Sequence, residues 1–292
     1  NDLIGLLTRR VERLYLDGAS ERSADLSREI ARLWIDKFSN HSQAAQHLER
    51  IVDIQEDDVE SLDLLTEIYE QKHDWQMLFD VLQKKVEFLE ATERVDTLVR
   101  MAEIAVQRLE MVDEGIELWR TVKEEQPERG DQALDILLER YERYDELVEV
   151  YLERLTNLTG AKRVTQLKQL IPILMDRLGD EERAEEALND ILETEPNDAF
   201  AEAKLRDRYV AAQNWNGLEV LYGSREKWHA LLSVLSASAD NVVDEVESSE
   251  LLKRMARICE ESLDNRVAAM ECWERLLTQQ PTHPEALQVL AP

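Results

Sequence analysis

One pattern occurs four times along this chain and constrains its fold more than any other feature. A small residue is followed by an apolar residue four positions later, by another after three more, and usually by Pro five positions beyond. The i, i+4, i+7 spacing places the first three residues on one face of a helix. Since Pro cannot continue a helix, each copy predicts an amphipathic helix that ends nearby. The copies are Ala44/Leu48/Ile51/Glu56, Gly115/Trp119/Val122/Pro127, Ala184/Leu188/Ile191/Pro196 and Ala269/Trp273/Leu276/Pro281.

A second pattern follows the first and sets the length of the repeat. It comprises Leu62-x2-Leu65-x3-Tyr69 and then Trp75-x2-Leu78-x3-Leu82, with a later copy between residues 205 and 222 and a degenerate copy between residues 137 and 151. Each copy predicts a helical hairpin with a short polar turn. The first three small residues are 71 and 69 positions apart (115 − 44 and 184 − 115). The long period of about 70 residues is therefore two hairpins of about 35 residues each.

These motifs resemble tetratricopeptide repeats, whose unit of 34 residues carries W-x2-L-G-x2-Y on its first helix and A-x3-F followed by P on its second. The residues at matching places are Leu205, Tyr209, Ala184, Leu188 and Pro196. The resemblance covers nearly the whole chain and is greatest to the long, divergent arrays of bacterial proteins. It implies an all-α fold, an α-solenoid of stacked antiparallel helical hairpins that forms a right-handed superhelix of sixteen or seventeen helices.

The repeat is irregular in two places. The last period is 85 residues (269 − 184), which is 16 longer than the one before, and the excess falls between Gly223 and Asp244. We therefore expect helical repeats at residues 1–222, an irregular or kinked helical insertion at 223–248, and further repeats at 249–292 that stop within a unit, as in a piece of a longer protein. Pro172 predicts a second kink because it lies inside an otherwise apolar helix.

Composition limits the partners that this chain can bind. With 63 acidic and 35 basic side chains, the formal net charge is -28, which repels nucleic acid and anionic lipid. No apolar run reaches the roughly 20 residues that cross a bilayer, so we expect no membrane insertion. Cys259 and Cys272 lie thirteen residues apart without zinc-ligand spacing and predict buried thiols in a reducing compartment, so we expect a cytoplasmic location.

No motif in the chain predicts catalysis. The five histidines are scattered without the spacing of a metal site, and the eight glycines form no phosphate-binding loop. Ser224-Arg225-Glu226-Lys227 matches S-x-x-K, but the companion motifs of penicillin-recognising enzymes are absent. We therefore expect no catalytic residues, no metal and no cofactor.

The resemblance also implies a binding surface. In tetratricopeptide arrays the first helix of each hairpin lines the concave side, which here gives an acidic first half and a mixed, apolar later part. These residues are Glu60, Asp63, Glu67, Gln71, Arg100, Gln107, Arg108, Phe200, Ala203, Asp207 and Val210. Ordinary solvated helix faces explain them equally well, and both interpretations stay open. Trp34 and Trp228 become candidate partner anchors if they are exposed.

The sequence thus predicts a non-catalytic scaffold that binds a peptide, a helix or a protein along a solenoid face, with a basic partner favoured by the net charge. Two alternatives remain. The array is either the regulatory or substrate-recruiting arm of a larger enzyme or signalling protein, or a structural solenoid that self-associates.

Overall fold

The computed structural model describes residues 2–242 and 244–290, and this part of the chain contains helices and no strand. The chain divides into two compact units, Asn1–Leu147 and Val148–Pro292. The first unit contains α1 Asp2–Leu16, α2 Ser20–Phe38, α3 His41–Ile54, α4 Val59–Lys72, α5 Trp75–Val86, α6 Ala91–Arg108, α7 Val112–Glu125 and α8 Pro127–Arg140. The boundary between the units falls within α9, Tyr144–Leu155.

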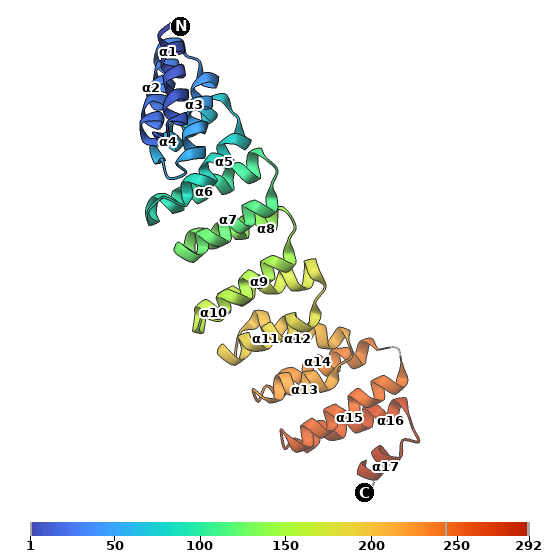
Figure 1. Ribbon diagram of the computed structural model, residues 1–292. Coiled ribbons are helices and arrows are strands. Elements are labelled where there is room, and N and C mark those ends of the chain that lie inside the picture. The colour runs from blue at the N-terminus through green and yellow to red at the C-terminus, as the bar shows by residue number, and fades with distance from the viewer. Residues whose placement is uncertain (1, 243, 291–292) are drawn as a thin grey trace. The chain divides into compact units, whose positions relative to one another are not determined.

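The second unit continues with α10 Gly160–Pro172, a π-helical segment η1 Ile173–Leu178, α11 Glu181–Thr194, α12 Ala199–Ala211, α13 Trp215–Gly223, α14 Trp228–Asn241, α15 Glu245–Glu261, α16 Arg266–Gln279 and α17 Pro284–Leu290. Within each unit the helices follow one another as antiparallel hairpins, and each packs chiefly on its neighbours in the chain (Figure 1). Such nearest-neighbour packing defines a helical solenoid, so the predicted α-solenoid fold is confirmed. The seventeen α-helices among these residues agree with the predicted number.

The turns within the hairpins share one feature of backbone conformation. Each contains a residue with positive φ, which ends a helix in the left-handed conformation. These residues are Ser39, His73, Glu110, Glu142, Gly179, Gln213, Glu226 and Asp264. From Ser39 to Gln213 their separations are 34, 37, 32, 37 and 34 residues, so they mark the hairpin period along the backbone.

Most of these turns are followed at once by a capping side chain. Asn40, Asp180, Asn214 and Asn265 each accept a hydrogen bond from the backbone N–H three residues later, at 3.0–3.1 Å. Asp74 does the same for Met77 at 3.5 Å. Each bond satisfies a backbone donor that the first turn of a helix leaves free, and so fixes where the second helix of the hairpin begins.

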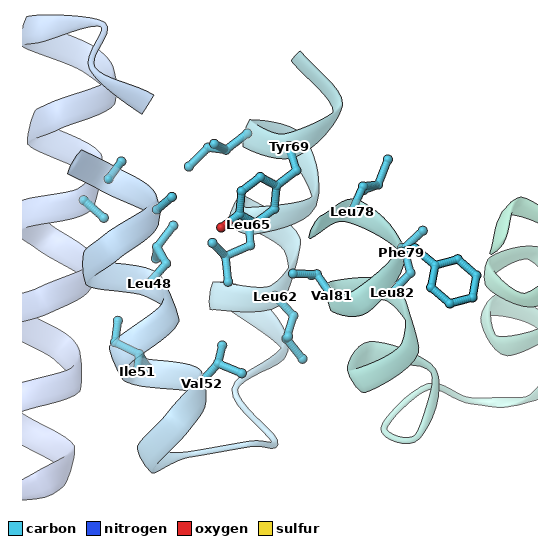
Figure 2. Packing of buried hydrophobic residues seen from close by; sticks show 14 of the residues in the cluster. Leu48, Ile51, Val52, Leu62, Leu65, Tyr69, Leu78, Phe79, Val81 and Leu82 are labelled. Atoms are coloured by element: carbon cyan, nitrogen blue, oxygen red, sulfur yellow. The ribbon is translucent and has the colours of Figure 1, made fainter. Parts of the chain in front are cut away.

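The repeated small residues lie where neighbouring helices touch. Ala44, Ala184 and Ala269 are buried, and so are the apolar residues Leu48 and Ile51 that follow the first of them. Figure 2 shows this core in α3, α4 and α5, where Leu62 and Leu65 of α4 lie between α3, with Leu48 and Ile51, and α5, with Leu78 and Leu82. Gly115 takes the small position in α7, and a Cβ there would lie 2.3 Å from Cγ2 of Val106. The helix faces predicted from the spacing are the faces that pack.

The two irregular places differ in kind. Glu226 has positive φ only 13 residues after Gln213 (226 − 213). The nine-residue α13 is therefore both the second helix of the hairpin that turns at Gln213 and the first helix of the hairpin that turns at Glu226. The Trp228 ring packs over Gly223, where a Cβ would lie 2.7 Å from Cη2. At Pro172 the missing N–H breaks the α-helical ladder, and the chain continues for six residues as π-helix.

The division into 1–222, 223–248 and 249–292 stays a prediction, and Asn1, Val243, Ala291 and Pro292 within it lie outside the described residues. No helix within residues 2–242 and 244–290 has the length and apolar character needed to cross a membrane.

Candidate functional site

The residues predicted to line a groove lie on three first helices. Glu60, Asp63, Glu67 and Gln71 are exposed on α4, and Arg100, Gln107 and Arg108 lie on α6 of the same unit. Phe200, Ala203, Asp207 and Val210 lie on α12 in the other unit. The structure therefore places the predicted residues in two separate groups.

The acidic first half of the predicted groove is largely engaged in ion pairs. Glu60 on α4 binds Arg28 of α2 at 3.2 Å and also contacts Arg32. Asp63 binds Lys85 of α5 at 2.6 Å.

Pairs of the same kind join the next first helices. Arg100 of α6 binds Glu70 of α4 at 2.7 Å, and Arg129 of α8 binds Asp96 of α6 at 3.1 Å. Each exposed pair is worth about 0–1 kcal/mol, but together they link α2, α4, α6 and α8. We call the ion pairs of Glu60, Asp63, Glu70 and Asp96 the ion-pair ladder. Its carboxylates already have cationic partners, which lowers their attraction for a basic ligand.

The later part of the predicted surface borders a true groove in the second unit. A groove of about 610 Å³ lies between α12 and α14, and Asp207 and Val210 are among its lining residues. Phe200 and Ala203, nearer the start of α12, do not line it. We call this the α12–α14 groove.

The α12–α14 groove combines an apolar wall with polar groups that converge on it. Val210, Trp215, Val234 and Ala237 contribute apolar surface. Arg206 binds Asp207 at 2.6 Å, so both charges are satisfied within the wall.

Glu247 of α15 also lines this groove, and one of its carboxylate oxygens has no partner among the described residues. Its Oε2 accepts a hydrogen bond from Gln213 Nε2 at 2.9 Å, whereas its Oε1 is buried and has no hydrogen-bond partner in this part of the chain. A carboxylate oxygen without a donor can still accept a hydrogen bond if a side-chain rotation brings it to a ligand. Sequence reasoning missed Glu247 because it lies 34 positions beyond Gln213 (247 − 213) and outside the repeated motifs.

Two further grooves lie between second helices and were also missed. One, of about 680 Å³, lies between α3 and α5 across α4 and is lined by Tyr69. The other, of about 330 Å³, lies between α11 and α13 across α12 and is lined by Tyr209. We call them the Tyr69 groove and the Tyr209 groove. Both tyrosines belong to the repeated motif, which the sequence assigned to packing alone.

The two tyrosine hydroxyls have the same partner type. Tyr69 donates a hydrogen bond to Glu49, and Tyr209 donates to Oε1 of Glu185 at 2.6 Å. Burial, together with the glutamate that accepts the hydrogen bond, raises the pKa of Tyr69 above its usual value and that of Tyr209 to about 12. Both hydroxyls therefore stay protonated as donors at neutral pH.

Neither candidate tryptophan anchor is exposed. Trp34 is half-buried against Phe38, with ring centroids 5.1 Å apart, and Trp228 is half-buried over Gly223. The condition that would make either one a partner anchor is not met.

The possible metal ligands and the two cysteines are the side chains to examine for a reactive centre. No group of three or more His, Cys, Asp or Glu there is arranged to hold a metal ion. Cys259 and Cys272 are free thiols, and burial raises the pKa of both, that of Cys272 to about 11. Thiols in this state are poor nucleophiles.

Of the comparisons with known proteins, only the one with solved structures finds matches. No protein-family model matches the chain, and no curated protein matches it. The C-terminal part of a TPR repeat-containing protein from Cytophaga hutchinsonii aligns at 14% identity and a TM-score of 0.32, covering 93% of this chain and 99% of that one.

Two other solved structures extend the comparison. YrrB, described as a TPR protein with an unusual peptide-binding site, aligns at 15% identity and a TM-score of 0.26, over 71% of this chain and 96% of that one. A structure of Naa15/Naa10 bound to HypK-THB aligns at 16% identity and a TM-score of 0.38, over 92% of this chain and 39% of that one. The C. hutchinsonii protein and YrrB are tetratricopeptide repeat proteins, the superfamily that the sequence motifs resemble.

Proposed function

We propose that this chain is a non-catalytic scaffold that binds a protein or peptide partner, and that the α12–α14 groove is its principal site. The observation that carries this proposal is that one groove of about 610 Å³ combines an apolar wall with Glu247, a carboxylate that is not fully hydrogen-bonded within the described residues. Peptide-binding sites combine apolar pockets, which supply affinity, with a few polar groups that fix orientation.

The groove fits an extended segment or a helix with a basic or N–H group placed to meet Glu247. The apolar wall from Val210 to Ala237 would bury one or two apolar side chains of the partner. Since α14 forms the opposite wall, the predicted insertion at 223–248 has a role in this proposal: it builds the site.

The remaining groups support a binding role over catalysis. The thiols have raised pKa values, and the carboxylates of the ion-pair ladder are engaged with basic side chains. The proposal therefore includes no cofactor, and we propose a cytoplasmic location because both cysteines are free.

The test is a binding experiment with a matched control in the same unit. A peptide selected from a random library against the wild-type chain is measured against Val210→Asp, in the groove, and against Val267→Asp, a valine that is 69% exposed on α16. We expect Val210→Asp to weaken binding at least about tenfold and Val267→Asp to leave it unchanged. Equal effects, or selected peptides that bind both variants normally, would contradict the proposal.

A second candidate function, self-association, is favoured by exposed apolar side chains on α1. Leu6 is 62% and Leu16 is 83% exposed, and Leu16 borders a hollow of about 510 Å³ formed with α2 and α3. Light scattering over a range of concentrations tests it: Leu6→Lys with Leu16→Lys should abolish any growth in mass, and a wild-type mass that does not rise with concentration would exclude it.

A further inference from the structure

The Tyr69 groove has an apolar floor. Val52 of α3, Leu65 and Tyr69 of α4, and Val81 of α5 line it, and Figure 2 shows these side chains between the three helices. Its volume of about 680 Å³ is within the range of about 300–1,000 Å³ that binding pockets usually have. Phe88, after the end of α5, also lines the groove and is 39% exposed. A large exposed aromatic ring beside an apolar floor is typical of a binding surface.

The rim of the Tyr69 groove is acidic and has few internal partners. Asp53, Glu56, Asp80 and Glu87 line it, all four are exposed, and none forms an ion pair with another residue that the structure describes. Asp80 accepts one hydrogen bond, from Gln76 at 3.0 Å. Lys84 is the one basic residue in the lining. The carboxylates of the ion-pair ladder, by contrast, already bind arginine or lysine.

We propose that the Tyr69 groove binds a basic segment of a partner protein in which Lys or Arg flanks an apolar side chain. The floor of Val52, Leu65 and Val81 would bury the apolar side chain. The long Lys or Arg side chains reach outward to the rim, where four carboxylates attract them. The site lies in the other unit from the α12–α14 groove and does not depend on it.

The rim geometry favours a basic segment over other cationic ligands. No three acidic side chains among the described residues are close enough to hold a metal ion, so the carboxylates act as separate contacts along the groove. Separate contacts match charges spaced along a chain. A net charge of -28 also speeds the approach of a basic segment from a distance.

The experiment uses a dye-labelled hexapeptide that alternates Lys and Leu, measured by fluorescence anisotropy with the whole chain. The groove variant combines Asp53→Asn, Asp80→Asn and Glu87→Gln. The control variant combines Glu60→Gln, Asp63→Asn and Glu67→Gln, and so removes the same number of charges from the first-helix face predicted from the sequence.

We expect the groove variant to weaken binding about tenfold or more at about 0.05 M salt, and the control variant to weaken it less than about threefold. Raising the salt concentration to about 0.5 M should imitate the groove variant in the wild-type chain. A hexapeptide with Glu in place of Lys should not bind.

A separate variant tests the apolar part of the groove. Phe88→Ser changes an exposed residue without altering charge, and we expect it to weaken binding about threefold while leaving the salt dependence unchanged. Val210→Asp should leave this binding intact, which separates a failure here from a failure at the α12–α14 groove. Equal losses of affinity in the groove variant and the control variant would overturn the proposal. So would unchanged affinity in both the groove variant and Phe88→Ser.

Discussion

The Tyr69 groove and the Tyr209 groove occupy equivalent places in two copies of the repeat and differ in their rims. Each lies between two second helices, and in each a tyrosine of the intervening first helix donates to a glutamate of the preceding helix. The Tyr69 rim has four carboxylates without ion pairs, whereas the lining of the Tyr209 groove includes Asn214, Asn216 and Arg225. The tyrosine and its glutamate partner thus recur in both grooves, whereas the other lining residues differ.

The two glutamates also differ in their other partners. Glu185 accepts from Arg208 Nε at 2.9 Å in addition to Tyr209. Glu49 forms no ion pair within the described part of the chain, so Tyr69 is the partner that satisfies it. The same hydrogen bond should consequently contribute more to stability in the first unit than in the second.

The largest expected effect tests whether the two grooves share one framework. Ala184→Glu and Ala44→Glu each force a carboxylate into a fully buried helix interface beside one of the grooves. Each should lower the free energy of unfolding by about 2–4 kcal/mol, measured by urea denaturation. Ala199→Glu, at an exposed position at the start of α12, is the control and should have little effect. Unfolding of either buried variant at the wild-type midpoint would contradict the shared register.

The next largest effect is the difference in stability that the two tyrosine hydroxyls contribute. Tyr69→Phe leaves Glu49 without its donor and should lower the free energy of unfolding by about 1–2 kcal/mol. Tyr209→Phe should cost about 0.5–1 kcal/mol, because Arg208 still binds Glu185. Paired urea titrations measure both. A larger loss for Tyr209→Phe would show that the glutamate partners do not explain the difference.

The framework of both grooves could be predicted from the sequence because helix packing has a fixed period. Ala184, Leu188 and Ile191 repeat at helical spacing, and burial at those positions leaves few alternatives. The last period of 85 residues, 16 longer than the one before, predicted an irregular stretch after Gly223 in the same way. That α13 belongs to two hairpins could not be predicted, since this depends on the backbone angle at Glu226.

The sites were harder to predict because exposure and partnership are not periodic. Glu60 and Asp80 are both acidic residues on exposed helix faces, and the sequence does not distinguish them. Glu60 meets Arg28 across 32 positions, whereas Asp80 meets no cation among the described residues. The predicted acidic surface lay on the first-helix face, where Glu60 and Asp63 are paired, and the four carboxylates of the Tyr69 rim were missed.

A smaller effect concerns pH. Because the pKa of Tyr209 is raised to about 12 in the folded chain from about 10 when unfolded, the neutral hydroxyl stabilises the fold. This contribution is complete below pH 10 and is lost as the pH rises toward 12. Between these values the free energy of unfolding of the wild type should fall by about 1 kcal/mol more than that of Tyr209→Phe. Parallel pH curves for the two proteins would contradict the assignment.

The smallest effect compares single carboxylates on the two second helices that precede the tyrosines. Asp190 of α11 is bound by Arg163 Nε at 3.1 Å, and both side chains are about one-third exposed. Asp53 of α3 is exposed on the acidic rim and forms no ion pair with the described residues. Asp190→Asn should lower the free energy of unfolding by less than about 1 kcal/mol.

Asp53→Asn should instead leave stability unchanged or raise it by a few tenths of a kcal/mol at low salt, because it removes repulsion among the rim carboxylates. Both differences should shrink as salt rises to about 0.5 M, since each is electrostatic and close to solvent. Urea titrations at two salt concentrations measure them. A loss of stability for Asp53→Asn as large as that for Asp190→Asn would mean that the rim carboxylates support the fold, and it would remove the reason for assigning them to a ligand.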